Sequence, residues 1–391
     1  MKKSRLIKSK MMSTTMPIKV NLSLGLIPLL ISFFLTLCVV RIPASDYSLL
    51  VEDVRANRWF IVDIDGNCRE IKLGVTKGDY LQVIPNGQFL TYKLDDGRNT
   101  PRSVRACRLP SKVGDEVETS MEFQLPAVMS MHAYRALLSP DGSKIVCYGP
   151  PAMKILNIAA GKWDENALVS SSEAMAIRNP SWNRESSLVA FYLKERDDSF
   201  SLWVADAEGK SARCISPKSV PSYKLGLGDD MESNEISWTP DGKNVIFGAR
   251  FDNAHTGNVH SSVFVKCHIY SINIDSLKCE MVVEGAYPIL NPNGSMLVFS
   301  DGEGQKIINL NTREIKILDR HNTGGMPIFN PTGDMMVFDT YETRKGLGNR
   351  TRISVLSGNG SPIFYLDPPF SSWDHSLTEQ IGRKFWIANR Q

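Results

Sequence analysis

The stretch that decides the fold is TPDGKNVIFGAR, residues 239–250. Pro240 fixes one backbone torsion, Asp241 can hydrogen-bond back to the local backbone, and Gly242 accepts the positive φ that a tight turn requires. The apolar run after the glycine has the composition of a buried strand. The stretch therefore predicts a β-hairpin.

The same pattern recurs along the chain. Related stretches begin at Ile84, Ser139, Asn291 and Asn330, and a degenerate copy begins at Trp182. The turn glycine recurs at Gly87, Gly142, Gly242, Gly294 and Gly333, and Ser186 takes its place in the degenerate copy. The strand positions after each turn are mostly apolar, so both faces of these strands should be buried. A sheet packed between two neighbouring sheets satisfies that requirement.

A second type of hairpin lies between the copies, most clearly in FSLWVADAEGKSARCIS from Phe200. Two hairpins per repeat give four strands, the content of a propeller blade. The six intervals from Gly87 to Gly382 average about 49 residues, which suits such a blade. The chain opens with a second-type hairpin at residues 58–73 and closes with a first-type unit around Gly382. We therefore predict an all-β fold: a β-propeller of seven four-stranded blades, with six as the alternative, whose N- and C-terminal strands share one blade.

Two of the copies, ISWTPDGKNVIF and PSWNRESSLVAFY, resemble the repeat of the TolB-like (WD-like) β-propeller family. The resemblance covers about residues 58–388. It implies a propeller fold and a ligand- or protein-binding role, and it supplies no catalytic residue. The GxSxG, P-loop and HExxH signatures are absent from the sequence. We expect neither catalytic residues nor a cofactor.

The N-terminal region predicts export. Residues 20–40 carry no charge, and 21 residues in a helix span about 30 Å, enough to cross a bilayer core. The basic leader, residues 1–19, should remain in the cytoplasm, so residues 20–40 form a membrane anchor and the propeller, residues 45–391, lies in the periplasm or another extracytoplasmic space. The alternative is a signal peptide cleaved near Ala44, which would release a secreted propeller.

The charge of the chain is unevenly distributed. Residues 1–41 hold seven of the 45 basic residues and none of the 42 acidic ones, so the rest of the chain has a slight acidic excess. Binding to nucleic-acid phosphates requires an excess of basic residues, which the propeller lacks. The charge therefore argues against a nucleic-acid partner. We expect a monomer.

Candidate site residues follow from the propeller fold. The segment that leads into each innermost strand rims the central channel, where ligands usually bind. Polar residues in such segments are Asp79, His132, Arg178, Asp229, Asp230, Glu232 and His321. They predict a protein or glycan ligand at the rim.

The resemblance also supplies an alternative function. TolB-like propellers of the oligogalacturonate lyase type hold a metal with rim histidines and act on acidic sugars, so His132 and His321 could serve a metal-dependent polysaccharide lyase or hydrolase. Two histidines fall short of the usual set. We therefore predict a binding module without a metal.

Cysteine and tryptophan positions favour structural roles. Beyond Cys38 the six cysteines are scattered without a C-x-x-C pair, which favours buried free thiols over disulfides. Tryptophans recur at repeat positions, where packing between blades explains them better than stacking on a sugar. They are Trp182, Trp203, Trp238, Trp373 and Trp386.

Overall fold

The chain divides into two compact units, Met1–Ala44 and Ser45–Gln391. The computed structural model describes residues 47–53, 58–63, 65, 67–73, 81–84, 88–94, 101–109, 118–124, 135–149, 152–163, 174–195, 200–217, 236–250, 267–301, 304–319, 327–344, 348–366 and 381–388. All of them belong to the second unit. Within these ranges no helix has the length and apolar character needed to cross a membrane. The predicted leader and anchor, residues 1–19 and 20–40, lie outside the described residues.

The described strands form seven four-stranded sheets, and every strand pair within them is antiparallel. Six sheets are built from consecutive strands. The first three of these contain β4 (Leu81–Val83), β5 (Gln88–Leu94), β6 (Pro101–Arg108) and β7 (Glu118–Gln124); β8 (Arg135–Leu138), β9 (Lys144–Gly149), β10 (Ala152–Asn157) and β11 (Lys162–Trp163); and β12 (Ala174–Trp182), β13 (Leu188–Glu195), β14 (Phe200–Asp206) and β15 (Ala212–Cys214).

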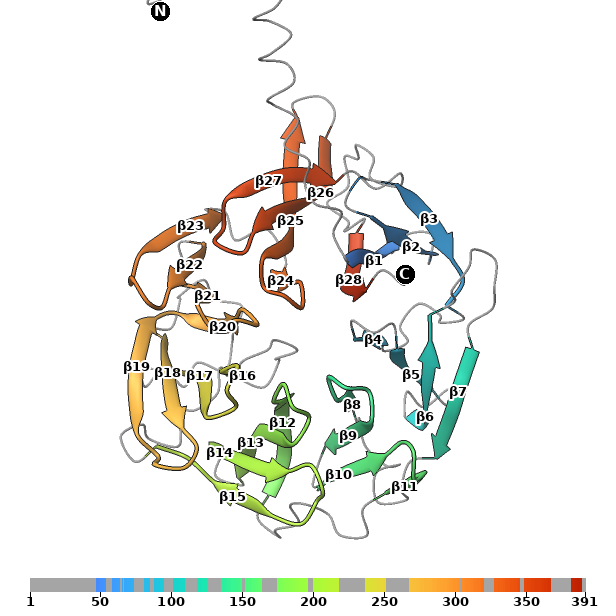
Figure 1. The fold of residues 1–391 in the computed structure, drawn as a ribbon, viewed down its shortest axis with the longest axis vertical. Coiled ribbons are helices and arrows are strands. Elements are labelled where there is room, and N and C mark those ends of the chain that lie inside the picture. Colours follow the sequence, from blue (N-terminus) through green and yellow to red (C-terminus); the bar gives the residue numbers. More distant parts are fainter. Residues whose placement is uncertain are drawn as a thin grey trace, which may run out of the picture. The chain divides into compact units, whose positions relative to one another are not determined.

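The next three sheets repeat the same order. They contain β16 (Ile236–Trp238), β17 (Asn244–Arg250), β18 (Cys267–Asn273) and β19 (Cys279–Glu284); β20 (Ala286–Leu290), β21 (Met296–Ser300), β22 (Gln305–Asn309) and β23 (Ile315–Asp319); and β24 (Ile328–Phe329), β25 (Met335–Arg344), β26 (Gly348–Ser357) and β27 (Pro362–Leu366). Figure 1 shows the sheets arranged around a central axis, with the first strand of each sheet innermost.

The remaining sheet joins the two ends of the described chain. Its order is β28 (Ile381–Ala388), β1 (Tyr47–Asp53), β2 (Arg58–Val62) and β3 (Cys68–Ile71). Leu49 lies opposite Trp386 and Leu50 opposite Phe385. The predicted all-β propeller and the blade shared by both chain ends are confirmed. Six blades, the number given as the alternative, are each built from strands that follow one another in sequence. The sheet that joins the two chain ends is a seventh four-stranded sheet.

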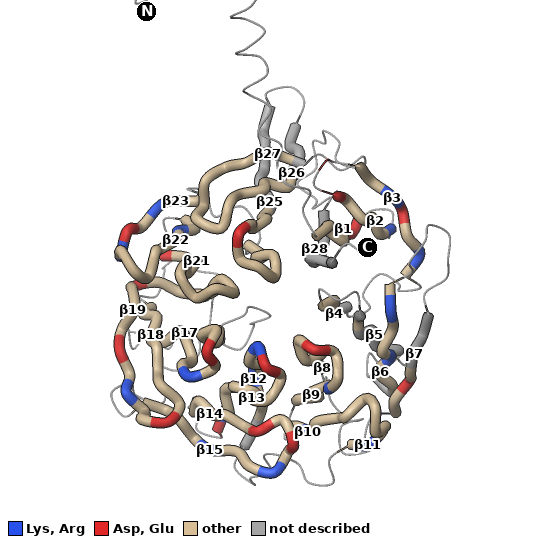
Figure 2. Tube along the Cα trace, in the orientation of Figure 1, with Lys and Arg blue, Asp and Glu red and all other residues tan. Residues whose placement is uncertain are grey.

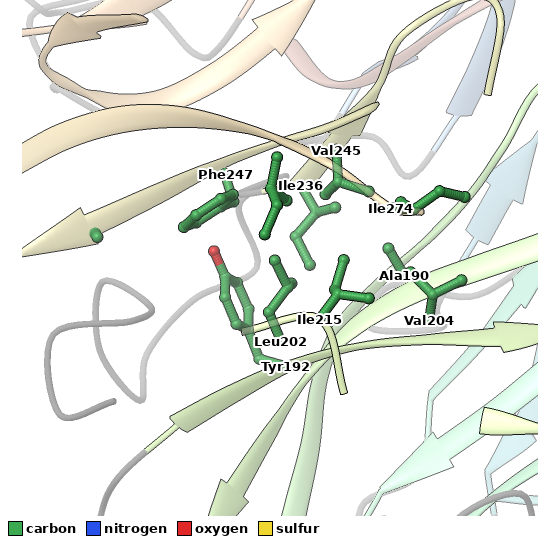
Figure 3. Close-up of a cluster of buried hydrophobic side chains, with 11 residues drawn as sticks. Ala190, Tyr192, Leu202, Val204, Ile215, Ile236, Val245, Phe247 and Ile274 are labelled. Atoms are coloured by element: carbon green, nitrogen blue, oxygen red, sulfur yellow. The ribbon is translucent and has the colours of Figure 1, made fainter. Parts of the chain in front are cut away.

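The core lies between neighbouring sheets rather than within one layer. Along β13, Val189 and Phe191 pack into a cluster with β9 and β10, whereas Ala190 and Tyr192 pack into a cluster with β17 and β18. Figure 3 shows the second cluster, in which Tyr192 faces Phe247. Both faces of the strand are therefore buried, as the apolar repeats predict. Full burial of a side chain of this kind contributes roughly 1.5–3 kcal/mol.

The repeated turns share one hydrogen-bond pattern. In the turn of residues 239–244, the Thr239 amide donates to Asn244 O at 3.0 Å and the Gly242 amide donates to Thr239 O at 2.9 Å. The Thr239 Oγ1 accepts the Asn244 amide at 3.0 Å. The turns at residues 139–144, 183–188, 291–296 and 330–335 repeat these three bonds. The residue at the glycine position has a positive φ in all five turns, and Ser186, with φ 55°, occupies it in the degenerate copy as predicted.

These five turns also contact one another in sequence order, and we call the set the turn arc. The Asp141 amide donates to Ser186 Oγ at 3.1 Å, which links the first turn to the second. A Cβ at Gly242 would lie 3.4 Å from Asn183 Nδ2, so the second turn touches the third. In the same way Gly294 approaches Pro240 and Gly333 approaches Pro292. The turn arc thus ties five consecutive blades together at one end.

Asp141 is held in its charged form by the turn arc. Partial burial raises the pKa of its carboxyl, but hydrogen bonds from Ser139, Ser143 and Ser186 outweigh burial and lower the pKa to about 2. The Ser139 hydroxyl donates to Asp141 Oδ1 at 2.6 Å and the Ser143 amide donates to the same atom at 3.0 Å. The carboxylate therefore completes the turn as an acceptor.

Candidate functional site

Arg178 is the one predicted rim residue that lies in the described part of the chain. It belongs to β12, the innermost strand of its sheet. The other six predicted residues lie outside the described residues: Asp79, His132, Asp229, Asp230, Glu232 and His321.

The register of β12 places Arg178 on a defined face. Arg178 lies opposite Tyr192 on β13, and directly opposed residues of an antiparallel pair project from the same face of the sheet. Tyr192 packs into the cluster between this sheet and the sheet of β16 to β19, and its hydroxyl donates to Gly248 O at 3.2 Å. Arg178 is therefore on the side of β12 that faces the next blade.

A β-bulge follows Arg178 directly. The pairing of β12 with β13 shifts register between Arg178 and Ser181, and Asn179 adopts a left-handed φ of 46° just before Pro180. Asparagine tolerates this conformation better than most residues. Bulges re-aim neighbouring side chains and are frequent next to functional sites.

A second innermost strand carries the same bulge. In β20 the register shifts between Ala286 and Ile289, and Tyr287, with φ 58°, precedes Pro288. Asn179 and Tyr287 each lie four residues before the first residue of a turn of the turn arc. These bulges were not predicted from the sequence. The sequence feature that could have revealed both bulges is a proline at the same distance before two of the repeated turns.

The guanidinium of Arg178 has an unused donor. Its Nε is buried and has no hydrogen-bond partner, although the side chain as a whole is only half-buried. An unsatisfied buried donor costs about 1–3 kcal/mol. A carboxylate that reached this position would gain a charge-assisted hydrogen bond. The partner that this donor lacks is a hydrogen-bond acceptor, such as a carboxylate.

The innermost strands around Arg178 are joined across blade boundaries by side chains. The Trp182 Nε1 donates to Leu137 O at 3.2 Å, and the Trp238 Nε1 donates to Ser181 O at 2.9 Å. The Ser237 hydroxyl donates to Pro288 O at 3.1 Å. Trp182 and Trp238 thus pack between blades, as the sequence predicts. They hold the strand that carries Arg178 in a fixed position.

The six described cysteines form no disulfide with one another. Cys107 and Cys147 are buried, and Cys214 is exposed. Burial raises the pKa of the Cys147 thiol, and burial followed by the nearby Asp63 raises the pKa of Cys68 to about 11. Both thiols are therefore protonated at neutral pH, and a protonated thiol is a poor nucleophile and metal ligand.

Charges of both signs lie at the inner ends of the sheets and on the outer strands (Figure 2). No region of a single sign stands out in the part of the chain that the figure colours. Arg178 would thus act on a ligand through close contact rather than through a long-range field. Within the described ranges, no group of three or more His, Cys, Asp or Glu residues is arranged to hold a metal ion.

No model of a known protein family and no curated protein sequence matches the chain. Among solved structures, an oligogalacturonate lyase in complex with manganese is similar, with a TM-score of 0.50 and 15% identity over 81% of this chain and 83% of that one. The fold is a β-propeller.

Two TolB structures show the same likeness. TolB from Acinetobacter baumannii aligns with a TM-score of 0.43 and 14% identity, over 84% of this chain and 78% of that one. A putative TolB from Agrobacterium tumefaciens aligns with a TM-score of 0.42 and 18% identity, over 66% of this chain and 86% of that one. The β-propeller fold that the repeats predict is confirmed by the sheet topology. Likeness at these identities carries neither activity nor ligand to this chain.

Proposed function

We propose that this chain is a non-enzymatic binding module: an extracytoplasmic propeller, anchored by residues 20–40, that binds a protein or glycan at the channel rim. The observation that carries the proposal is the buried, unpartnered Nε of Arg178 on an innermost strand. A donor left without an acceptor in the free protein is satisfied when a ligand supplies one.

The chemistry of Arg178 favours an acidic ligand group. Arginine binds carboxylates through two parallel N–H···O bonds, which fixes the orientation of the ligand as well as its charge. A uronic acid of a glycan and an Asp or Glu of a protein both provide that group. The other six residues predicted for the rim, which lie outside the described ranges, belong to the same proposed site.

The proposed location rests on the N-terminal sequence. The uncharged run of 21 residues is long enough to span a bilayer, and the basic residues before it favour a cytoplasmic N-terminus. Cleavage near Ala44 is the alternative, in which case the propeller is secreted. The size of the mature chain, measured by mass spectrometry, distinguishes the two.

The binding test uses the full chain in detergent and two matched probes. Trigalacturonate supplies carboxylates, and maltotriose is its neutral counterpart. Calorimetry should show that the wild type prefers trigalacturonate and that Arg178→Gln weakens this binding by about 10–100-fold. Arg184→Gln, an exposed arginine in a nearby turn, serves as the control and should leave binding unchanged.

If neither sugar binds, the glycan form of the proposal fails. The protein form then predicts that a photo-crosslinker at Ser181, next to the bulge, captures one specific protein in an envelope extract. Loss of that capture in Arg178→Gln would support the proposal; an unchanged pattern in the variant would overturn it.

The enzymatic alternative is tested in the same sample. Incubation of the full chain with Mn²⁺ and polygalacturonate should release no unsaturated uronate. Release that disappears in both His132→Ala and His321→Ala would overturn the non-enzymatic proposal and establish a metal-dependent lyase.

A further inference from the structure

Exposed apolar side chains gather on three successive outermost strands. Met281 on β19, Ile315 and Ile317 on β23, and Ile363 and Tyr365 on β27 are 39–53% exposed. We call these five residues the outer band. The outermost strands β3 and β15 instead expose polar or charged residues such as Glu70 and Arg213. The outermost strand β7 exposes one large apolar residue, Met121, at 41%. Within the described residues, exposed apolar side chains on successive outermost strands are thus most numerous on β19, β23 and β27.

The three strands of the outer band are neighbours in space. The Arg313 guanidinium, in the turn before β23, donates to Val282 O on β19 at 3.4 Å. On the other side, a Cβ at Gly360 would lie 2.6 Å from Leu318 Cδ2, so the turn between β26 and β27 touches β23. The outer band is thus continuous, with β23 at its centre.

Strand β23 is an edge strand. It pairs with β22 on one side, and the described part of the chain places no strand on its other side. An edge strand presents backbone donors and acceptors that another strand can pair with. Charged side chains usually block such pairing. In the first part of β23, Lys316 lies between two isoleucines, each about half exposed (48% and 51%), and the other charged residue of the strand, Asp319, is at its end.

The sequence of this edge is complementary to itself. Side chains alternate along a strand, so Glu314 and Lys316 project to one face and Ile315 and Ile317 to the other. The Lys316 Nζ lies 3.8 Å from Glu314 Oε1, which agrees with a shared face.

Two copies of this edge can pair antiparallel about a twofold axis with Ile315 opposite Ile315 of the partner subunit. Glu314 then lies opposite Lys316 of the partner subunit, and this attractive pair occurs twice. Shifting the centre by one residue places Lys316 opposite Lys316 of the partner subunit, which opposes like charges. The charges therefore favour the register centred on Ile315.

We propose that the outer band is the interface between two copies of this chain, formed by antiparallel pairing of β23 with β23 of the partner subunit. This state replaces the monomer expected from the sequence. The pairing depends on neither the rim ligand nor Arg178.

A lipid surface fits the outer band less well than a second copy. The charged residues in and around β19 and β23 have no basic excess: Lys278, Arg313 and Lys316 stand against Glu280, Glu284, Glu314 and Asp319. Anionic bilayers attract surfaces with a basic excess. A set with charges of both signs is what a self-complementary strand pair requires.

Charge reversal tests the interface. Sedimentation of the full chain in detergent should show a concentration-dependent dimer. Glu314→Lys and Lys316→Glu should each weaken it by about tenfold, because attractive pairs become repulsive. The double variant Glu314→Lys/Lys316→Glu re-creates the complementary pairs and should restore the dissociation constant to within about threefold. All these positions are exposed, so thermal unfolding should be unchanged and serves as the folding control.

Cysteine crosslinking tests the register. Ile315→Cys lies opposite its own copy and should form a disulfide-linked dimer on oxidation. Ile317→Cys lies four residues from its copy along the paired strands, roughly 13 Å, and should not crosslink. The wild type, which has the exposed Cys214, measures the background.

Three results would overturn the proposal. They are a wild type that stays monomeric at all concentrations, a double charge reversal that fails to restore the dimer, and crosslinking of Ile317→Cys in preference to Ile315→Cys. In nanodiscs, labelling of β23 by a bilayer-confined photoreactive lipid would assign the outer band to lipid and would also overturn it.

Discussion

The indole N–H of Trp238 donates to the carbonyl oxygen of Ser181 at 2.9 Å, across the boundary between two blades. Ser181 lies at the end of the bulge that follows Arg178. One side chain therefore joins two innermost strands and supports the strand that carries the candidate site. Because the contact links separate sheets, it should matter for stability as well as for the position of Arg178.

Trp238→Phe should lower the free energy of unfolding by about 1–2 kcal/mol, because Ser181 O loses its donor while the aromatic volume is largely kept. Urea denaturation measures the loss. The control is Trp203→Phe, since Trp203 Nε1 donates to Ser201 Oγ on its own strand. If Trp203→Phe lowers the free energy of unfolding as much as Trp238→Phe does, the hydrogen bond between blades contributes no more to stability than one within a strand.

Gly294→Ala should destabilise the propeller by about 2–4 kcal/mol. Its φ is +78°, and an added Cβ would lie 2.7 Å from Pro240 Cδ in the preceding turn. Gly161→Ala is the matched control, because Gly161 has φ +63° and no atom within 4 Å of the added Cβ. It should cost only about 1 kcal/mol, the strain of a left-handed alanine. The measurement is the free energy of unfolding in urea, supported by thermal unfolding. If Gly294→Ala and Gly161→Ala lose the same free energy, a close contact between the turns is contradicted.

Asp141→Asn should remove part of the acid sensitivity of the fold. The pKa of Asp141 is lowered from 3.8 to about 2, so the carboxylate stabilises the folded state above pH 4 and that contribution is lost as the pH falls through 2. Asp141 is largely exposed, so solvent screening reduces the effect to about 1 kcal/mol. The measurement is the difference in unfolding free energy between wild type and variant at pH 6, 4 and 2.5. A difference that does not shrink towards low pH would show that Asp141 titrates normally.

Deletion of residues 370–391 should abolish cooperative unfolding, because β1 loses its pairing with β28. Leu50 and Val51 of β1 are fully buried, so loss of the neighbouring strand exposes apolar surface. Calorimetry of the truncated chain measures this. Adding residues 370–391 as a separate peptide should restore the transition, and deletion of residues 389–391 alone should have little effect. A truncated chain that melts like the wild type would argue that β28 is dispensable for closure.

The local chemistry of the fold was predictable from the sequence. A Pro-Asp-Gly turn constrains its own backbone, so the positive φ of Gly242 and even that of Ser186 could be read from single repeats. The contacts between turns could not. The approach of Gly294 to Pro240 depends on how two repeats 52 residues apart stack, and no spacing within one repeat encodes it.

The candidate site was predictable only in part. Arg178 was predicted to lie in the segment that leads into an innermost strand, and the structure places it within that strand, β12. Its unpartnered Nε and the bulge at Asn179 were not foreseen, because both depend on the pairing of β12 with β13.

The turn arc makes the two ends of the propeller unequal as places to alter the molecule. Each turn touches the next, so a residue inserted there disturbs two neighbours at once. The connection between β17 and β18 starts at Arg250, at the far end of β17 from the turn arc, and it already carries the insertion 251–266. Loop grafting for new specificity therefore belongs away from the turn arc, and the connection that follows Arg250 is the first choice.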